Sequence, residues 1–585
     1  MTSDKQASSV GDEITEVHDT PKTQMSSSAR QLLDGGAPAF RWASLWEAPV
    51  INHLNGKSYT LPIFNLRCQQ TINFHLSWMG FFVAFLSWFA FPPLLPEAIK
   101  VDLKLTTAQI GNSNVIALLA TLLVRFAMGP LVDRYGPRKM MALMLVVGAI
   151  PSGMAGLIHN ASGLYAVRFF IGILGGTFVP CQSWTTSFFD KNIVGTANAL
   201  VGGWGNLGGG VTFVVMVSLF QTLVNDHLSA HNAWRAAYAI VPVPILFFVA
   251  IITLVFGTDC PAGKWSQRHT LPASAIAARQ GHLMQLDADE RKVVESKMAE
   301  KEQGTAIVAE ASDDEEDENL AIDLDIAVAE HLTWKSFGKL MSTAYTWLPA
   351  LMYMTTFGFE LAVDANLANV LFASHSKTKG FGQVNAGYYA STFGFLNFVT
   401  RPMGGFLADR IYIRYGVKGK KYFSVILGFI MGAMALGMGL YQRGVYIEKK
   451  LPILNVQMGF VVLVSLQPDS RIRIVVDWFV SVQMAVFCEM ANGSIFALVP
   501  HCNAFNNGFM SGLVGGFGNI GGIIFALICE FLQPASVAQG LISDISCCLK
   551  VRFHPLQSYS QAWWISGIFA MGVNALCFFI PAPPQ

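Results

Sequence analysis

Charged side chains are scarce in this chain. Asp, Glu, Lys and Arg make up 13% of its 585 residues, whereas hydrophobic residues make up 52%, and the mean hydropathy is +0.43. An average soluble domain carries about 25% charged residues, so the composition excludes an ordinary soluble protein. We therefore expect a protein embedded in the lipid bilayer.

Cysteine clusters and catalytic motifs are also missing. The nine cysteines stand singly, apart from the pair Cys547 and Cys548, and none has the spacing of a disulfide framework or a metal site. No nucleotide loop, metal cluster or nucleophile triad is recognisable. We expect neither an enzyme nor a bound metal or cofactor. The polar N-terminal region lacks the apolar core of a signal peptide, so the first membrane helix is expected to direct insertion.

Long apolar runs are abundant. Runs of about 18 or more apolar residues predict membrane-spanning helices, and twelve such runs fall into two sets of six. The first set is 74–95, 107–128, 140–158, 164–188, 194–220 and 234–256. The second is 338–363, 384–408, 421–441, a broken run over 457–500, 507–532 and 562–581. The sequence thus predicts an all-α membrane protein with two six-helix bundles, residues 61–258 and 334–585.

Polar segments precede and divide the two bundles. The polar composition of residues 1–60 predicts a disordered tail. Residues 259–333 are predicted to form an acidic linker, which contains SDDEEDE from Ser312. We expect a solvated tether; the alternative hypothesis is that a kinase phosphorylates Ser312 beside its acidic neighbours. Basic residues favour the cytoplasmic side, so both termini and the linker are predicted to be cytoplasmic. The basic residues after the second and eighth helices are Arg134, Arg138, Lys139, Arg410, Arg414, Lys418, Lys420 and Lys421.

Two segments do not fit the pattern. Residues 466–480 place two Arg, two Asp and a Pro where the tenth helix should cross the membrane, and residues 543–557 lengthen a short connection. Each is either a real insertion or a stretch wrongly retained when the coding sequence was assembled. For 466–480 we favour the second interpretation, because an intact helix results when the segment is removed. Sequencing of the mature transcript tests it.

Two motifs recur in the two sets of helices. VRFAMGPLVDRYG, from Val124, aligns with TRPMGGFLADRIY, from Thr400, and GGWGNLGGGV at 202–211 matches GGFGNIGGII at 515–524. Matching motifs at the second and fifth helices of each half indicate two parallel repeats, with a substrate site between them near the bilayer midplane. The first alignment pairs Arg125 with Arg401, Asp133 with Asp409 and Arg134 with Arg410.

Arg125 and Arg401 each lie eight residues before the aspartate of their motif, which puts them near mid-membrane. A charge there costs about 2.5 kcal/mol or more, so two symmetry-related arginines indicate function. The guanidinium group is a planar fork of donors suited to two oxygens of an oxyanion. A small planar anion such as nitrate or nitrite fits better than a sugar. Glu360, Asp364 and Glu489 are the few candidate counter-charges, and Glu489 is either a proton-coupling group or a structural partner of an arginine.

Each glycine stretch places its small residues on one helix face. At about 100° per residue, Asn206 shares a face with three glycines, and so does Asn519. Faces without side chains permit close helix approach and bring the backbone within reach of an anion. The asparagine amides are candidate hydrogen-bond donors to its oxygens. The glycines concerned are Gly202, Gly205, Gly209, Gly515, Gly518 and Gly522.

The paired glycine stretches resemble the nitrate signatures of the nitrate/nitrite porter family within the major facilitator superfamily. GPLVDRYGPRK resembles the superfamily's loop motif, which implies conformational gating by Asp133, Arg134, Asp409 and Arg410. FVAFLSWFAFPPLLP, VRFFIGILGGTFVPCQSW and GTANAL are most similar to fungal members. The resemblance covers about residues 60–580, apart from the two unusual segments.

The resemblance implies roles for individual residues. Arg125 and Arg401 take the positions of substrate-clamping arginines, and Asn206 and Asn519 those of signature asparagines. Tyr353 and Phe357 resemble an aromatic pair that lines the substrate site, with Phe178 as a further candidate. The implied function is import of nitrate and nitrite across the plasma membrane, driven by protons. Two alternatives remain open: a nitrate/nitrite antiporter and a nitrate sensor.

Overall fold

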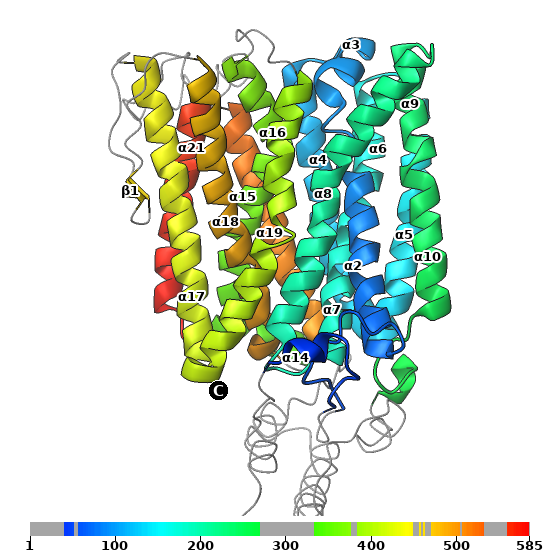
Figure 1. Cartoon of the computed structure of the whole chain (residues 1–585), viewed down its shortest axis with the longest axis vertical. Helices are drawn as coiled ribbons and strands as arrows, with labels where there is room; N and C mark the ends of the chain where they lie inside the picture. Colours follow the sequence, from blue (N-terminus) through cyan, green and yellow to red (C-terminus); the bar gives the residue numbers. More distant parts are fainter. Residues whose placement is uncertain are drawn as a thin grey trace, which may run out of the picture.

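The structure is a computed structural model of the whole chain. It describes residues 40–51, 56–268, 333–375, 383–447, 456–457, 460–461, 470–503, 506–531 and 558–583. Within these ranges the chain is almost entirely helical, and the long helices stand side by side (Figure 1). The regulatory hypothesis about Ser312 and the unusual segment 543–557 lie outside the described residues.

The first half contains six passes across the molecule. One pass is built from α6 and α7 joined by a tight turn of helix at Gly172–Thr177, and another from α9 followed by α10. The elements are α2 (Gln69–Trp88), α4 (Thr107–Tyr135), α5 (Pro137–Gly153), α6 (Ala161–Ile171), α7 (Phe178–Phe188), α8 (Val194–Asn225), α9 (Ala230–Ile240) and α10 (Pro242–Phe256). A short α3 (Lys100–Asp102) precedes α4.

The second half repeats this arrangement. A short α14 (Trp334–Ser342) leads into α15 (Ala344–His375), and α16 (Gln383–Leu396) continues into α17 (Thr400–Ile447). The last three passes are α18 (Ser470–Cys502), α19 (Asn507–Phe531) and α21 (Ser558–Phe579). The strands β1 (Val456–Gln457) and β2 (Phe460–Val461) form a small antiparallel pair before α18.

Length and composition support membrane crossing by these helices. Nine described segments pass both criteria, one of them the 56-residue segment Asn385–Leu440. That segment crosses twice, because Gly416 has a φ of 63° and reverses the chain. Adding α2 and α15, which carry more polar side chains, gives twelve passes among the described residues. The predicted all-α membrane fold of two six-helix bundles is confirmed.

The tenth pass differs from its prediction. We predicted that residues 466–480 interrupt this helix, but α18 is continuous from Ser470 to Cys502. The expected first part of the pass, residues 457–465, is instead the β1–β2 region and residues outside the described ranges. The helix has no need of the earlier apolar run, because 470–480 supply its first turns. The candidate membrane span in this pass is Val482–Cys502, so 466–480 as an insertion, and its presence in the mature transcript, stay predictions.

Several chain connections gather at one end of the molecule. The C-terminus and α14 lie at the same end in Figure 1, where α17 also turns back on itself. Hydrogen bonds join this end together: Lys421 donates to the carbonyl of Phe578, and the Trp265 indole donates to the carbonyl of Asp133 at 2.9 Å. Gly136, with a φ of 91°, makes the matching turn of the first half between α4 and α5. We call this end the linker side.

The two halves meet through matching helices. Across the interface α4 contacts α19, and α8 contacts α17. These are the second helix against the eleventh and the fifth against the eighth, so each contact is the counterpart of the other under exchange of the halves. Every motif that recurs in the sequence lies on one of these four helices.

A polar cluster holds the end opposite the linker side. Asp102 accepts hydrogen bonds from His231 at 2.8 Å, Trp234 at 3.0 Å and Arg235 at 2.7 Å. Burial raises the pKa of the Asp102 carboxyl, but the three hydrogen bonds and the charge of Arg235 outweigh it and lower the pKa to about 2. The cluster ties α3 to α9.

Asp102→Asn should lower the free energy of unfolding of the purified protein by on the order of 1 kcal/mol at neutral pH. Because the folded-state pKa is below the ordinary value of 3.8, this stabilisation is present above that value and is lost as pH falls toward about 2. Thermal unfolding in detergent should therefore show a difference between wild type and variant that shrinks in strong acid. A difference independent of pH would contradict the role of the ionised carboxylate.

Candidate functional site

Two arginines, one from each half, lie at the centre of the interface. Arg125 on α4 is 0% exposed and Arg401 on α17 is 1% exposed. Arg125 donates from Nε to the carbonyl of Gly175 at 2.9 Å and from Nη1 to the carbonyl of Gly515 at 2.8 Å. Arg401 donates from Nη2 to the Tyr353 hydroxyl at 2.7 Å. The predicted pairing of two buried arginines across the halves is what the structure shows.

Some guanidinium donors remain unused among the described residues. Nη2 of Arg125 and both Nε and Nη1 of Arg401 are buried without a hydrogen bond. A buried donor without a partner costs about 1–3 kcal/mol, and more when charged. Nη1 of Arg401 faces the carboxylates of Glu360 and Glu489 only at 3.8 Å and 3.9 Å, beyond hydrogen-bond distance, so these donors remain available to the oxygens of an anion.

A wall of aromatic rings joins the two arginines. The guanidinium carbons of Arg125 and Arg401 lie 5.2 Å and 5.8 Å from the centre of the same ring, Phe357. Tyr353 stacks on Phe357 at 4.7 Å, and Phe178 lies nearly parallel to Phe357 at 6.3 Å. The three aromatic residues predicted for the site are thus brought together with both arginines.

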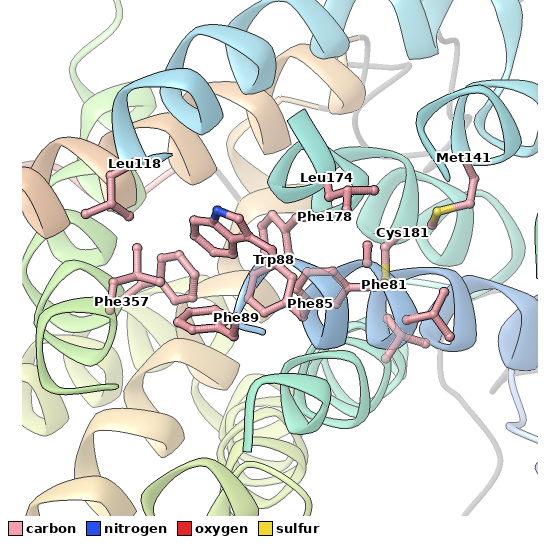
Figure 2. Close-up of a cluster of buried hydrophobic side chains, with 14 of the residues drawn as sticks. Phe81, Phe85, Trp88, Phe89, Leu118, Met141, Leu174, Phe178, Cys181 and Phe357 are labelled. Atoms are coloured by element: carbon pink, nitrogen blue, oxygen red, sulfur yellow. The ribbon is translucent and has the colours of Figure 1, made fainter. Parts of the chain in front are cut away.

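The aromatic row of α2 covers this wall. Figure 2 shows Phe178 and Phe357 beside the side chains that α2 contributes, and the rings of Phe81 and Phe178 are 5.3 Å apart. Such a covering excludes water and strengthens electrostatic interactions with a bound ion. The α2 residues that line it are Phe81, Phe85, Trp88 and Phe89.

The first glycine of each stretch lies against the arginine of the opposite half. A Cβ on Gly202 would be 3.2 Å from Nε of Arg401, and one on Gly515 would be 3.3 Å from Cδ of Arg125. A side chain at either position would push into the guanidinium group. These glycines therefore make room for the arginines as well as for helix contact.

The remaining predicted glycines face rings and leucine side chains. A Cβ on Gly205 or Gly209 would meet Phe81 or Phe89 of α2, and one on Gly518 would meet Phe357 and Tyr353. Gly522 faces Leu361. Other glycines of the same stretches, such as Gly208 and Gly521, make the closest contacts with backbone atoms of neighbouring helices. We had selected the glycines that face the arginines and rings, and not those at which the helices pack most closely.

The signature asparagines have protein partners in this conformation. The Nδ2 of Asn206 donates to Glu360, and the Nδ2 of Asn519 donates to the carbonyl of Gly515 at 3.0 Å. Both Oδ1 atoms are buried without a hydrogen bond among the described residues. The predicted donation from these amides to the anion therefore requires a rearrangement, most directly for Asn206, and stays a prediction.

Two glutamates complete the site. Glu360 on α15 and Glu489 on α18 are both 0% exposed, and each Oε2 lies 3.8–3.9 Å from Nη1 of Arg401. Asn397 and Asn492 also donate to Glu360, at 3.1 Å and 2.7 Å. We did not predict these two asparagines. Asn492 stands three residues after Glu489, so helical spacing alone places them on one face.

A second pair of equivalent contacts lies at the linker side, where each motif aspartate caps a helix of the other half. Asp133 accepts from the backbone N–H groups of Gly508 and Phe509, both at 3.0 Å, at the start of α19. Asp409 accepts from the backbone N–H and hydroxyl of Thr196, at 2.6 Å and 2.7 Å, at the start of α8. A carboxylate is stabilised at a helix N-terminus, so both contacts hold the linker side closed.

The motif arginines do not cross the interface in this conformation. Arg134 and Arg410 are exposed, and their guanidinium groups lie over Tyr135 and Phe406 of their own helices. Lys420 pairs with Asp409 at 3.0 Å and lies 3.0 Å from His501. The geometry of a gate is thus present at both aspartates, and Lys420 adds a cation to one of them.

Asp409→Asn should open the linker side more often, because asparagine lacks the charge and one acceptor that hold Thr196 and Lys420. A loss of about 1–3 kcal/mol predicts a severalfold or larger increase in labelling of the buried thiol Cys502, which follows His501. Peptide mass spectrometry after treatment with a permeant maleimide measures it. Asp226→Asn, at an exposed position on the opposite side, is the matched control. Unchanged Cys502 labelling in Asp409→Asn would argue against the gate.

Comparisons with known proteins agree with this architecture. The chain is 28% identical over 494 residues to the high-affinity nitrate transporter 2.3 of Oryza sativa subsp. japonica, covering 84% of this chain and 76% of the relative. It is 25% identical over 561 residues to the nitrate/nitrite transporter NrtP of a Picosynechococcus strain, covering 87% and 92%. The named transport activities are those of the two relatives.

A solved structure and a family model complete the comparison. The proton:xylose symporter XylE superposes with a TM-score of 0.56 at 13% identity, over 88% of this chain and 96% of that one, which shows the shared fold alone. The model of the Major Facilitator Superfamily matches residues 77–526. This range includes both repeats of the motif, both glycine stretches and both central arginines, and the chain belongs to the Major Facilitator Superfamily.

Proposed function

We propose that this protein imports nitrate, and also nitrite, across the plasma membrane by proton symport and alternating access. One observation carries the proposal: two buried arginines, one from each half, meet at the same aromatic ring with guanidinium donors left unused. Two relatives, whose alignments each cover more than four-fifths of this chain, are a nitrate transporter and a nitrate/nitrite transporter.

The chemistry of the site selects a small flat anion. Two guanidinium groups offer charge and paired donors for oxyanion oxygens. The nearly parallel rings of Phe178 and Phe357 both border the guanidinium group of Arg125, and such flat surfaces suit a planar ion better than a tetrahedral one. A neutral sugar would bring no negative charge to the two buried guanidinium groups, and buried charge is costly in a membrane.

The interface between the halves explains how access to the site can alternate between the two sides of the membrane. The arginines come from different halves, and the two aspartate contacts close the linker side. When those contacts break, the halves can separate at that side and release the ion. We place the linker side in the cytoplasm, with both chain termini, because the basic residues of the sequence gather there. Release at that side then amounts to import.

An energetic requirement points to protons as the driving ion. Moving an anion into a cell against an inside-negative potential costs about 2.3 kcal/mol per 100 mV. Two protons carried with each nitrate would reverse the sign of the transported charge and so make uptake favourable.

Voltage-clamped oocytes test the proposal. Nitrate and nitrite in the bath should evoke inward current that increases in acid, whereas sulfate and xylose should evoke none. Oocytes with the protein at the surface but without any anion-evoked current would contradict electrogenic import. Isotope counterflow on the same cells would then distinguish exchange of nitrate for nitrite from a sensor that does not transport.

A further inference from the structure

Two buried glutamates share one nitrogen of Arg401. The Oε2 atoms of Glu360 and Glu489 lie 3.8 Å and 3.9 Å from Nη1 of that arginine, and all three side chains are at most 1% exposed. The helices that carry Arg401 and Glu489 are locked together, because Gly493 of α18 packs against the carbonyl of Arg401. The carboxylates therefore compete with any anion for the same guanidinium group.

The two glutamates differ sharply in their hydrogen bonds. Glu360 accepts amide donors from Asn206, Asn397 and Asn492, which together occupy both of its oxygens. Three donors stabilise the ionised form of a carboxyl group. Glu360 is thus the better stabilised carboxylate of the two and serves as the counter-ion to Arg401.

Glu489 has no such support. Both of its oxygens are buried, and within the described part of the chain no group donates a hydrogen bond to either. A buried carboxylate without donors is unstable relative to its neutral form. The two carboxyls also interact directly, so a protonated Glu489 has an acceptor for its O–H in Glu360.

Other charged and titratable groups face Glu489 from the helices packed around it. From α17 it meets Arg401, and the described amides Asn206 of α8 and Asn397 between α16 and α17 are neutral and donate to its neighbour Glu360. Asp364 is half-buried one turn beyond Glu360, away from the linker side. The titratable groups are Arg401, Glu360, Asp364 and Cys488.

Charge balance links Glu489 to the anion. With both glutamates ionised, the two arginines are neutralised and a nitrate would add one uncompensated negative charge to the membrane interior. With Glu489 neutral, the site carries one excess positive charge, which a monovalent anion cancels. Proton and anion therefore favour each other's binding.

We propose that Glu489 is the site at which a proton binds together with the anion, freeing Arg401 from one of its two carboxylates. This rests on the proposed function and adds the identity of the coupling group. In the balanced step the carboxylate of Glu489 takes a proton from the external side, its O–H donates to Glu360, and nitrate takes its place beside Nη1 of Arg401. Deprotonation toward the linker side restores the competition and expels the anion.

Nitrate binding to purified protein, measured against pH, tests the inference. Wild-type affinity should fall as pH rises through the titration of Glu489, with a slope approaching about tenfold per pH unit. Glu489→Gln should bind nitrate with an affinity that no longer changes with pH. Glu360→Gln, the matched variant, should bind differently from wild type yet keep the pH dependence. A wild-type slope retained in Glu489→Gln would overturn the assignment.

A second measurement avoids the variants altogether. Nitrate added to wild-type protein in weakly buffered solution should cause uptake of about one proton per bound anion, seen with a pH indicator dye. Binding without proton uptake would overturn the inference and leave nitrate transport intact. If wild-type protein does not bind nitrate at any pH, the proposed function fails instead, so the two failures are distinguishable.

Discussion

Replacing Arg401 with lysine should lower nitrate uptake about a hundredfold, and Arg125→Lys should do the same. Lysine keeps the charge but loses the planar fork, so one or two charge-assisted hydrogen bonds to the anion are lost at about 1.5–3 kcal/mol each. Arg401→Lys would also release the Tyr353 hydroxyl, which Arg401 now holds at 2.7 Å. Uptake of labelled nitrate at several concentrations measures the effect.

Arg168 supplies the control for this experiment. It is also a buried arginine, but it donates to Ser113 and Asn114 and has no contact with Phe357 among its described interactions. Arg168→Lys should therefore preserve nitrate affinity, although it can affect stability. Wild-type uptake by Arg401→Lys, at equal surface amount, would show that the two arginines do not bind the anion.

Gly521→Ala should abolish correct folding, the other large effect that we expect. A Cβ at this position would overlap the carbonyl oxygen of Met354 on α15 and come within 3.2 Å of the Cα of Gly358. Both neighbours are backbone, so α15 and α19 would have to move apart. Overpacking of this kind costs about 3 kcal/mol or more. The yield of monodisperse protein in size-exclusion chromatography reports the loss.

Gly572→Ala is the matched substitution. Gly572 lies within α21, is exposed, and has no atom within 4 Å of a Cβ built on it. Alanine there should be neutral or stabilise the helix by up to about 1 kcal/mol. Equal yields for Gly521→Ala and Gly572→Ala would show that the α15–α19 contact is looser than the structure indicates.

Much of the fold was predictable because the chain crosses a lipid bilayer and because its motifs recur in both halves. An apolar run long enough to cross a bilayer has few alternatives to a helix, so the number of passes followed from the sequence. The two motif repeats then predicted that Arg125 and Arg401 face each other across the halves, because equivalent helices in a two-fold arrangement meet at the axis. Neither conclusion needed any side-chain contact.

Partner choice inside the site was not predictable in the same way. Asn206 donates to Glu360, 154 residues away, and helical periodicity gives a residue's face but not the rotation or tilt of the helix opposite. The start of the tenth pass was hard to predict for a different reason. Charged residues near the start of α18 looked like an interruption, yet a helix can begin with them when its apolar part follows. Windowed hydropathy does not distinguish the two cases.

The crossed contacts at the site have a consequence for how tightly the ion is held. Gly202 covers the arginine of the second half and Gly515 covers the arginine of the first, so any separation of the halves uncovers both arginines at once. Strong binding and closure are therefore a single equilibrium, and an ion cannot be held tightly while the protein is open to either side. A substitution that favours an open form should raise the dissociation constant and speed release together, even when it lies far from the ion.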